Sequence, residues 1–365
     1  MDKHTKYMSL ALKLARKAEG MTSPNPMVGA VIVKRDKILG QGYHKKAGLP
    51  HAEIEAFNDA AKKKNSITAS TLYVTLEPCC HEGKRTPPCV KAIIEKKISK
   101  VYIAMLDPNP KVSGNGVKQL RESGIEVEVG TLEDKAKVLN EAFTKYITTK
   151  KPFVILKLAA TMDGKIAAFT GDSKWIGSPN QRTFAHKLRN KVDGIMVGIE
   201  TVLKDNPSLN VRLAKKKTDP IPIALDRKLR IPLDSNLLKI HERSIIATSD
   251  LSKTNKVEKL QNLGASLLKI KEDKNGRLNL KELMTKLGKM EIMSVLIEGG
   301  SKVAASALKS DIVDKVVFFY SPKIVGSEGI SMIGELGIST ITKSLQVKNT
   351  KITKIHDEVM IEGYL

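Results

Sequence analysis

Residues 50–53 of the chain read Pro-His-Ala-Glu, and residues 77–89 read Glu-Pro-Cys-Cys-His-Glu-Gly-Lys-Arg-Thr-Pro-Pro-Cys. All three cysteines of the 365-residue chain lie in the second stretch. One imidazole and two thiolates suit Zn²⁺, and three protein ligands leave the fourth tetrahedral position for a water molecule, as in catalytic zinc sites. A structural site would normally be completed by a fourth cysteine or histidine. The two stretches therefore predict a catalytic zinc site.

The spacing of His51 and Glu53 indicates how these two side chains act. Water bound to zinc ionises near neutral pH, and the resulting hydroxide can attack an electron-poor carbon. If that carbon carries an amine, another group must bring protons to the leaving amine, and Glu53 is the candidate. Residues two positions apart do not share a helix face, so both must act from the end of a helix, which Pro50 marks.

The arrangement resembles the general zinc-deaminase signature, in which H-x-E is followed by P-C-x-x-C and the glutamate is not a ligand. The second half departs from it, because the cysteines are separated by ten or nine positions rather than three. Cys79 or Cys80 could each be the ligand that joins Cys89. His81 could also compete for the metal.

Apolar runs alternate with helical patterns along the chain and predict a layered α/β arrangement. In the first part we expect strands at 28–33, 71–75, 101–105 and 125–129, and helices at 51–64, 88–97, 115–123 and 132–146. The polar segment 147–152 ends in Pro152 and is the best boundary candidate. We therefore expect a zinc domain over 1–147 and a second α/β domain over 152–365. In the second domain, strands are expected at 153–160, 194–199, 221–225, 294–297 and 315–320.

The charge of the chain favours small phosphorylated ligands. Lys and Arg number 62 against 39 Asp and Glu, a net charge of +23, but 51 of the basic residues are Lys and only 11 are Arg. Aromatic residues make up 4%, so the arginine forks and stacking platforms of nucleic-acid readers are scarce. No stretch approaches the ~18 apolar residues of a membrane span. We expect a cytoplasmic enzyme with no nucleic-acid or membrane partner.

The second domain carries weaker signals of a ligand site. Residues 298–301 read Glu-Gly-Gly-Ser between an expected strand and an expected helix, where main-chain N–H groups can approach a phosphate. A tight strand-to-helix connection explains the glycine pair more simply. Residues 201–209 follow the strand at 194–199, at the edge where α/β sheets usually bind ligands. The chain has no G-x-G-x-x-G, so a standard dinucleotide fold is not indicated.

Five stretches carry a resemblance to one family and occur in its order: residues 25–29, 51–53, 75–89, 107–110 and 163–167. Over essentially its whole length, the chain resembles the bifunctional riboflavin-biosynthesis deaminase–reductases. The resemblance implies a cytidine-deaminase-like zinc domain followed by a dihydrofolate-reductase-like α/β domain that uses NADPH. It also implies that His51, Cys79 and Cys89 bind one zinc ion per chain. The cysteine loop is one residue longer than the family's usual spacing, which bears on the choice between Cys79 and Cys80.

The resemblance further implies the residues that contact each ligand. Asn25 would contact the pyrimidine, although a turn-forming Asn before Pro explains this residue equally well. The residues expected against the nucleotide are Ala159, Trp175, Thr201, Asp205, Gly300 and Ser301. Those expected to hold the phosphoribosyl substrate are Ser173, Arg189, Leu209, Arg212 and Glu298. Arginine suits bidentate phosphate binding. Trp175 could instead be a core aromatic residue, and Asp205 a helix or turn cap.

Together, the motifs and the resemblance imply a two-domain enzyme of riboflavin biosynthesis, and we expect it to be a homo-oligomer. The first domain would remove the 2-amino group of diamino-hydroxy-phosphoribosylamino-pyrimidine, with zinc hydroxide as nucleophile and Glu53 as proton shuttle. The second would reduce the opened ribosyl chain to ribityl with hydride from NADPH. Two alternatives remain: a nucleic-acid or nucleoside zinc deaminase with an accessory C-terminal domain, and a binding protein with a structural zinc. The scarce aromatic residues argue against the first, and the missing fourth ligand argues against the second.

Overall fold

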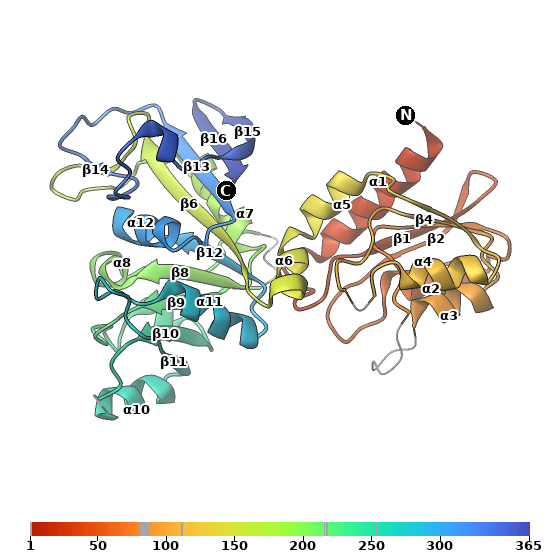
Figure 1. Cartoon of the computed structure of the whole chain (residues 1–365), viewed down its shortest axis with the longest axis horizontal. Helices are drawn as coiled ribbons and strands as arrows, with labels where there is room; N and C mark the ends of the chain where they lie inside the picture. The colour runs from red at the N-terminus through yellow and green to blue at the C-terminus, as the bar shows by residue number, and fades with distance from the viewer. Residues whose placement is uncertain (1, 81–87, 111, 215, 217, 253) are drawn as a thin grey trace. The chain divides into compact units, whose positions relative to one another are not determined.

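The computed structural model describes residues 2–80, 88–110, 112–214, 216, 218–252 and 254–365. The chain folds into two compact units, Met1–Lys150 and Lys151–Leu365, and each unit has its own β-sheet (Figure 1). No helix in the described part of the chain is long and apolar enough to cross a membrane. The hypothesis that His81 competes for the metal concerns a residue outside the described ranges.

The first unit is a three-layer α/β/α arrangement. Its sheet has the order β2-β1-β3-β4-β5: β2 Lys37–Tyr43, β1 Gly29–Lys34, β3 Thr71–Val74, β4 Lys100–Ile103 and β5 Glu126–Val129. One face is covered by α2 Ala52–Lys62, α3 Cys89–Glu95 and α4 Asn115–Glu122, and the other by α1 Lys3–Ala15 and α5 Glu133–Leu139. The two-residue period of β1 explains both layers, since Ala30 and Ile32 pack under α2 while Val31 and Val33 pack under α1.

One helix prediction in this unit is wrong. The single helix expected over 132–146 is two helices, α5 and α6 (Glu141–Thr149), which are separated at Asn140. The Asn140 side chain accepts a hydrogen bond from the Met27 N–H (2.8 Å) and donates one to the Met27 carbonyl (3.0 Å). Side-chain bonds of Asn to the main chain compete with helix formation, so a tertiary contact breaks a segment whose periodicity is continuous.

The second unit is built on a nine-stranded sheet that is parallel from β11 to β13. Its strands, in spatial order, are β11 Ala265–Lys269, β10 Ser244–Thr248, β9 Ile221–Leu225, β8 Gly194–Gly198, β12 Ser294–Glu298, β6 Phe153–Thr161, β13 Lys315–Ser321, β16 Glu358–Tyr364 and β15 Lys348–Ile355. Strand β16 is antiparallel to both of its neighbours, β13 and β15. A separate small ladder pairs β7 Lys165–Ala167 with β14 Ile330–Ser331. All five strands expected from apolar runs are present, as β6, β8, β9, β12 and β13.

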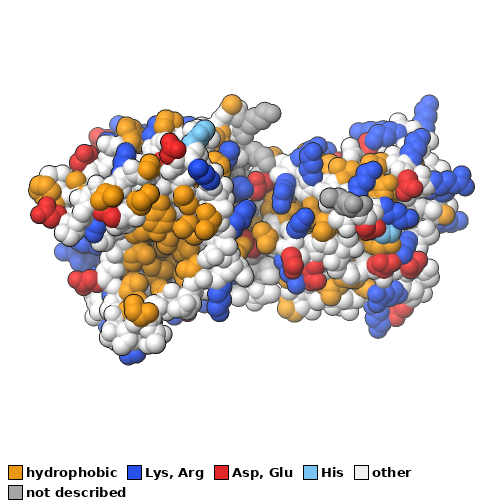
Figure 2. Space-filling view, turned by 90° about the horizontal axis from the view of Figure 1, so that it is seen from above, with side chains coloured by type: hydrophobic (Ala, Val, Ile, Leu, Met, Phe, Trp, Pro, Cys, Tyr) orange, Lys and Arg blue, Asp and Glu red, His pale blue; other side chains and the backbone are white. Residues whose placement is uncertain are grey.

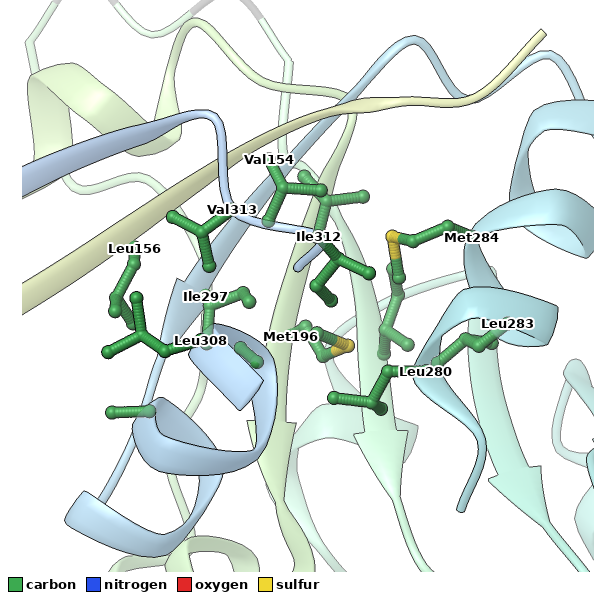
Figure 3. Packing of buried hydrophobic residues seen from close by; sticks show 14 of the residues in the cluster. Val154, Leu156, Met196, Leu280, Leu283, Met284, Ile297, Leu308, Ile312 and Val313 are labelled. Atoms are coloured by element: carbon green, nitrogen blue, oxygen red, sulfur yellow. The ribbon is translucent and has the colours of Figure 1, made fainter. Parts of the chain in front are cut away.

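Helices cover both faces of the parallel part of this sheet. One face packs against α11 Leu280–Lys289 and α12 Ser301–Lys309, and the other against α7 Pro179–Arg189, α8 Ile199–Asp205, α9 Asn236–Lys239 and α10 Thr254–Asn262. Figure 3 shows the first of these cores, where Leu156 and Ile297 from the sheet pack in one cluster with Leu308 of α12. Because both faces are covered, central strands are apolar at almost every position, as in β8. The loops at the carboxyl ends of these strands are left to form a ligand site.

Candidate active sites

Three predicted ligands meet in the first unit. His51 is the N-cap of α2, Cys89 is the first residue of α3, and Cys79 lies in the loop after β3. The Nδ1 atom of His51 lies 3.1 Å from Cys89 Sγ and 3.5 Å from Cys79 Sγ. A hydrogen bond between the thiols lowers the pKa of Cys79 to about 3 and raises that of Cys89. The two helix N-termini favour the thiolate that a metal requires.

The geometry of this cluster fits zinc. With Zn–S near 2.3 Å and Zn–N near 2.0–2.1 Å, tetrahedral coordination separates a sulfur from a nitrogen ligand by about 3.6 Å. The two observed separations are within about half an ångström of this value, and all three donor atoms lie within 4.8 Å of one another. Cys80 is not part of the cluster and packs against the apolar side chains beneath α2. Among the described residues, Cys79 rather than Cys80 is therefore placed to bind the metal.

Glu53 lies in the first turn of α2 with 3% of its surface exposed. Burial, reinforced by the neighbouring Cys79, raises the pKa of Glu53 to about 7, a range in which a carboxyl group can both accept and return a proton. Helix α2 is held close to β2 by two glycines. A Cβ at Gly40 would lie 2.3 Å from the Ala56 oxygen, and one at Gly42 would lie 2.5 Å from the Ala56 nitrogen. This close contact fixes the helix end from which Glu53 acts.

His44, which the sequence analysis did not single out, links Asn25 to the zinc site. Its Nδ1 lies 3.1 Å from the Pro50 carbonyl, which can only accept, so Nε2 accepts from the Asn25 amide at 3.1 Å. Burial lowers the pKa of His44 and keeps the ring neutral. The His44 ring meets the His51 ring edge-on at 5.5 Å. Asn25 is thus placed near the metal ligands.

Glu77 fixes the loop that carries Cys79. Its carboxylate is 3% exposed and accepts four main-chain hydrogen bonds, from the N–H groups of Asp107 (3.1 Å), Gly114 (3.0 Å), Gly116 (2.9 Å) and Val117 (3.2 Å). These donors belong to the loop after β4 and to the start of α4. A Cβ at Gly116 would lie only 2.4 Å from the Pro78 oxygen, so the main chain can approach this closely only at glycine.

The second unit contains a cavity of about 1080 Å³. All eleven residues expected in this unit line it: Ala159, Ser173, Trp175, Arg189, Thr201, Asp205, Leu209, Arg212, Glu298, Gly300 and Ser301. Gly300 is the N-cap of α12, and a Cβ there would meet nothing within 4 Å, so the main chain is open to a ligand. Among the described lining residues, ten are Lys or Arg and three are Asp or Glu. The excess of basic side chains makes the cavity suitable for anionic ligands.

A buried ion pair lies in the wall of this cavity. Arg189 donates to both carboxylate oxygens of Glu298, at 2.8 and 3.0 Å, and Lys157 Nζ lies 3.8 Å away. Burial alone would raise the pKa of Glu298, but Arg189 and Lys157 lower it to about 2. Arg189 also donates to the Asn210 carbonyl. Its N–H groups are thus largely engaged by protein acceptors, and it acts on a ligand chiefly through its charge.

Lys157 and His186 are two residues of the cavity wall that the sequence analysis did not single out. Lys157 lies in β6, and its one signal is a lone charge within an apolar strand. His186 lies on α7, and its Nδ1 accepts the Arg212 N–H at 3.3 Å. Burial, together with Arg189 and Arg212, lowers the pKa of His186 to about 4, so the ring is neutral at physiological pH. His186 thereby holds the main chain that presents Arg212 to the cavity.

Trp175 is not a core residue. Its side chain is 65% exposed, and the Arg182 guanidinium lies over the ring at 4.5 Å. Lys323 donates to the Trp175 carbonyl. The alternative interpretation of Trp175 as a core aromatic is therefore wrong. Leu209, by contrast, is buried in the core beneath the cavity, so it supports the wall mainly by packing.

Comparison with known proteins identifies the family. Residues 152–361 match the RibD C-terminal domain, and residues 1–105 match the cytidine and deoxycytidylate deaminase zinc-binding region. The riboflavin biosynthesis protein RibD of Aquifex aeolicus is 47% identical over 355 residues, 97% of this chain and 96% of that protein. The chain belongs to the RibD family. RibD of Escherichia coli is 36% identical over 367 residues, 97% of each chain.

Solved structures of RibD proteins agree with this assignment. A Thermotoga maritima structure superposes with a TM-score of 0.88 at 39% identity, covering 99% of this chain and 98% of that one. Acinetobacter baumannii RibD gives 0.87 at 33% identity, with the same coverage. The chain is therefore a bifunctional enzyme of riboflavin biosynthesis, with deaminase and reductase activities. The expected fold class is confirmed, as are zinc for the deaminase and NADPH for the reductase.

Proposed function

We propose that the Met1–Lys150 unit deaminates a phosphoribosylated diaminopyrimidine and that the Lys151–Leu365 unit reduces the product's ribosyl chain to ribityl. The observation that carries this proposal is the separation of the two chemistries. One unit holds a three-ligand metal cluster beside a buried Glu53, and the other holds a basic cavity beside a glycine-opened helix end. The Thermotoga maritima relative is described as a diaminohydroxyphosphoribosylaminopyrimidine deaminase and 5-amino-6-(5-phosphoribosylamino)uracil reductase.

In the deaminase unit, the chain's own residues position the substrate and move protons. His51, Cys79 and Cys89 would hold a zinc ion, which would supply an acidified water molecule as the nucleophile. The Glu53 carboxylate is placed to accept a proton and to return it to the leaving amine. The Asn25 amide, oriented by His44, binds the pyrimidine edge through the donor and acceptor that remain.

In the reductase unit, the residues bind and orient two anionic ligands, and NADPH supplies the hydride. The main-chain N–H groups after Gly300 receive the cofactor's phosphates, with Ala159, Trp175, Thr201, Asp205 and Ser301 around the rest of the nucleotide. Arg212 binds the substrate phosphate from the segment that His186 holds. Ser173, Leu209 and the Arg189–Glu298 pair complete the wall on which the ribosyl chain lies.

Two coupled assays test this division. Ammonia release from the diaminopyrimidine reports the first step, and NADPH oxidation with the deaminated product reports the second. Glu53→Gln should abolish only the first activity, and Arg212→Ala should impair only the second. If either variant lost both activities while remaining folded, the assignment of one reaction to each unit would be wrong.

We also propose that the protein is a homo-oligomer that associates through the reductase unit. Figure 2 shows a broad apolar area on this unit. Eight large apolar side chains between residues 324 and 352 are more than a third exposed: Ile324, Val325, Ile330, Ile338, Ile341, Leu345, Val347 and Ile352. Ile352 lies in the edge strand β15 and is paired with Ile361 of β16. Ile361 is in turn paired with Phe318 of β13. Exposed apolar surface is typical of subunit interfaces.

Analytical ultracentrifugation tests the oligomer. The parent protein should sediment as a dimer or larger species, and Ile341→Glu combined with Ile352→Glu should dissociate it. A parent protein that sediments as a monomer would contradict the proposal.

The three cysteines form no disulfide in the structure, and two of them are needed as metal ligands, which supports a reducing compartment such as the cytoplasm.

A further inference from the structure

The segment that carries Asn25 lies outside the sheet of the deaminase unit. Residues 25–28 precede Gly29, the first residue of β1, and form no strand. The hydrogen-bonded ladder of the sheet therefore does not fix the position of Asn25. Binding groups on loops depend on the scaffold that holds the loop, so other contacts must keep the Asn25 amide in place.

The end of this segment that joins β1 is held by neighbouring strands and loops. The His44 N–H donates to the Val28 carbonyl at 2.9 Å. The Gly29 N–H donates to Thr75 Oγ1 at 3.1 Å, and the Thr75 N–H donates to the Gly29 carbonyl at 3.1 Å. These bonds end one residue short of Met27.

Asn140 holds Met27 by both of its main-chain polar groups. The Oδ1 atom of Asn140 accepts the Met27 N–H at 2.8 Å, and Nδ2 donates to the Met27 carbonyl at 3.0 Å. The side-chain amide thus pairs with one residue as a neighbouring strand would. Asn140 is 2% exposed, so removing its side chain would leave the Met27 groups without a ready replacement from water.

The main chain of Asn140 is itself fixed by two helices. Its N–H donates to the Ala136 carbonyl at 3.1 Å, and its carbonyl accepts the Thr144 N–H at 2.8 Å. Asn140 is therefore both the C-cap of α5 and the N-cap of α6. Its side chain projects from a junction that is bonded on both sides.

The connection from Met27 back to Asn25 has little freedom. Pro26 is the one residue between them, and its ring holds φ at about −65° and restricts the residue before it. The Asn25 N–H donates to the Thr22 carbonyl at 2.7 Å, which fixes the segment on the other side. A displacement of Met27 is therefore passed on to Asn25.

We propose that Asn140 is a positioning residue for the deaminase reaction and sets the place of Asn25 through the main chain of Met27. The inference rests on the proposed function, in which the Asn25 amide binds the pyrimidine edge. Asn140 acts on the substrate only through Asn25. Such a role matters because a misplacement of about 1 Å at a reacting site can cost about a hundredfold in rate.

Steady-state ammonia release by the full-length enzyme tests the inference. Asn140→Ala removes both bonds to Met27 and should raise KM for the diaminopyrimidine about tenfold, with a smaller change in kcat, because the Asn25 contact is present in the ground and transition states alike. Zinc content and reductase turnover should stay at the parent level.

Asn140→Asp tests the same bonds without a change of size. The carboxylate keeps an acceptor for the Met27 N–H but turns a second oxygen, in place of an amide donor, toward the Met27 carbonyl. This variant should also raise KM about tenfold, whereas a side chain that only filled space would tolerate the change. Asn58→Asp is the matched control, since Asn58 is exposed in the same unit, and it should leave KM and kcat unchanged.

A double-mutant cycle separates positioning from general stability. Asn25→Ala removes the group that Asn140 positions and should itself raise KM about ten- to a hundredfold. In the Asn25→Ala protein, adding Asn140→Asp should raise KM by less than about twofold, because residues that act through one contact are not additive. A residue that merely stabilised the unit would raise KM by the same factor in both backgrounds.

Each outcome decides between the inference and the proposed function. If Asn25→Ala raises KM but Asn140→Ala and Asn140→Asp keep the parent value, the inference is overturned and the proposed function stands. The same holds if Asn140→Asp has an equal effect with and without Asn25. If Asn25→Ala itself leaves KM unchanged, or if the parent enzyme releases no ammonia from the diaminopyrimidine, the proposed function fails at that point and the inference fails with it.

Discussion

Replacing Glu298 by glutamine should destabilise the Lys151–Leu365 unit by about 3 kcal/mol at neutral pH, and this loss should disappear in acid. The carboxylate is held by Arg189 and Lys157, and glutamine would leave both positive charges without their buried partner. Breaking a buried ion pair by removing one member typically costs about 3–5 kcal/mol.

The pKa of Glu298 gives an independent magnitude. It falls from an ordinary value of 4.5 to about 2 in the folded protein, and each pKa unit corresponds to about 1.4 kcal/mol, which gives about 3 kcal/mol. Because the folded pKa is the lower one, this stabilisation is complete above about pH 4.5. It is lost progressively as the pH falls from there toward 2. Parent and variant should therefore converge in stability at low pH.

Urea denaturation followed by tryptophan fluorescence measures this effect. Trp175 is the only tryptophan in the chain and lies in this unit, so the signal reports its unfolding alone. The free energies of unfolding of the parent and Glu298→Gln should be compared at pH 7, 5, 4 and 3, with Glu328→Gln as an exposed control. A variant as stable as the parent at pH 7 would refute the reasoning, and so would a difference that persists unchanged in acid.

Four further predictions concern the two sites. Cys79→Ser should lose zinc and Cys80→Ser should retain it, as measured by metal analysis; the reverse result would overturn the ligand assignment. Glu53→Gln should keep zinc but lower the deamination rate by about 10²–10⁴-fold with reductase turnover unchanged, and near-normal deamination would remove Glu53 from the mechanism. Gly116→Ala should lower the melting temperature and zinc retention at a cost of about 1–3 kcal/mol, because its Cβ would lie 2.4 Å from a main-chain oxygen of the Cys79 loop. Arg212→Ala should raise KM for the reductase substrate about ten- to a hundredfold without changing KM for NADPH, and equal effects on both would contradict a phosphate contact.

The apolar strands were predictable because they are buried on both faces. The runs at β8 and β9 are short and apolar, which favours buried strands over helices. The same argument would have found β10, which is buried at every position and which the sequence analysis missed. Two other missed strands are of a different kind. β2 begins with exposed residues and contains Gly40 and Gly42, which are there because α2 lies so close. β15 is an edge strand whose residues are mostly exposed, so it lacks the burial pattern on which the prediction depends.

The sites show the same division between local and tertiary signals. His51 and Glu53 were predictable because the chemistry requires them at a short, fixed spacing. Spacing could not decide between Cys79 and Cys80, whereas the structure decides by packing Cys80 into the apolar layer. His44 is a single residue beyond an unpredicted strand, and its role depends on two partners that the fold brings to it. Such a residue has no pattern of its own for a sequence to show.

Glu77 illustrates how a fold can constrain evolution without catalysis. All four of its hydrogen bonds end on main-chain N–H groups, which every residue except proline provides. The bonds themselves therefore place no demand on the side chains at Asp107 and Val117. Gly114, with a φ of +80°, and Gly116, whose Cβ would lie 2.4 Å from the Pro78 oxygen, are fixed by their main-chain geometry instead. At position 77 itself, glutamine would turn an NH₂ group toward N–H donors, and aspartate would be one carbon too short. An acidic residue beside zinc ligands invites a catalytic explanation, but here its four hydrogen bonds to the main chain are sufficient to account for it.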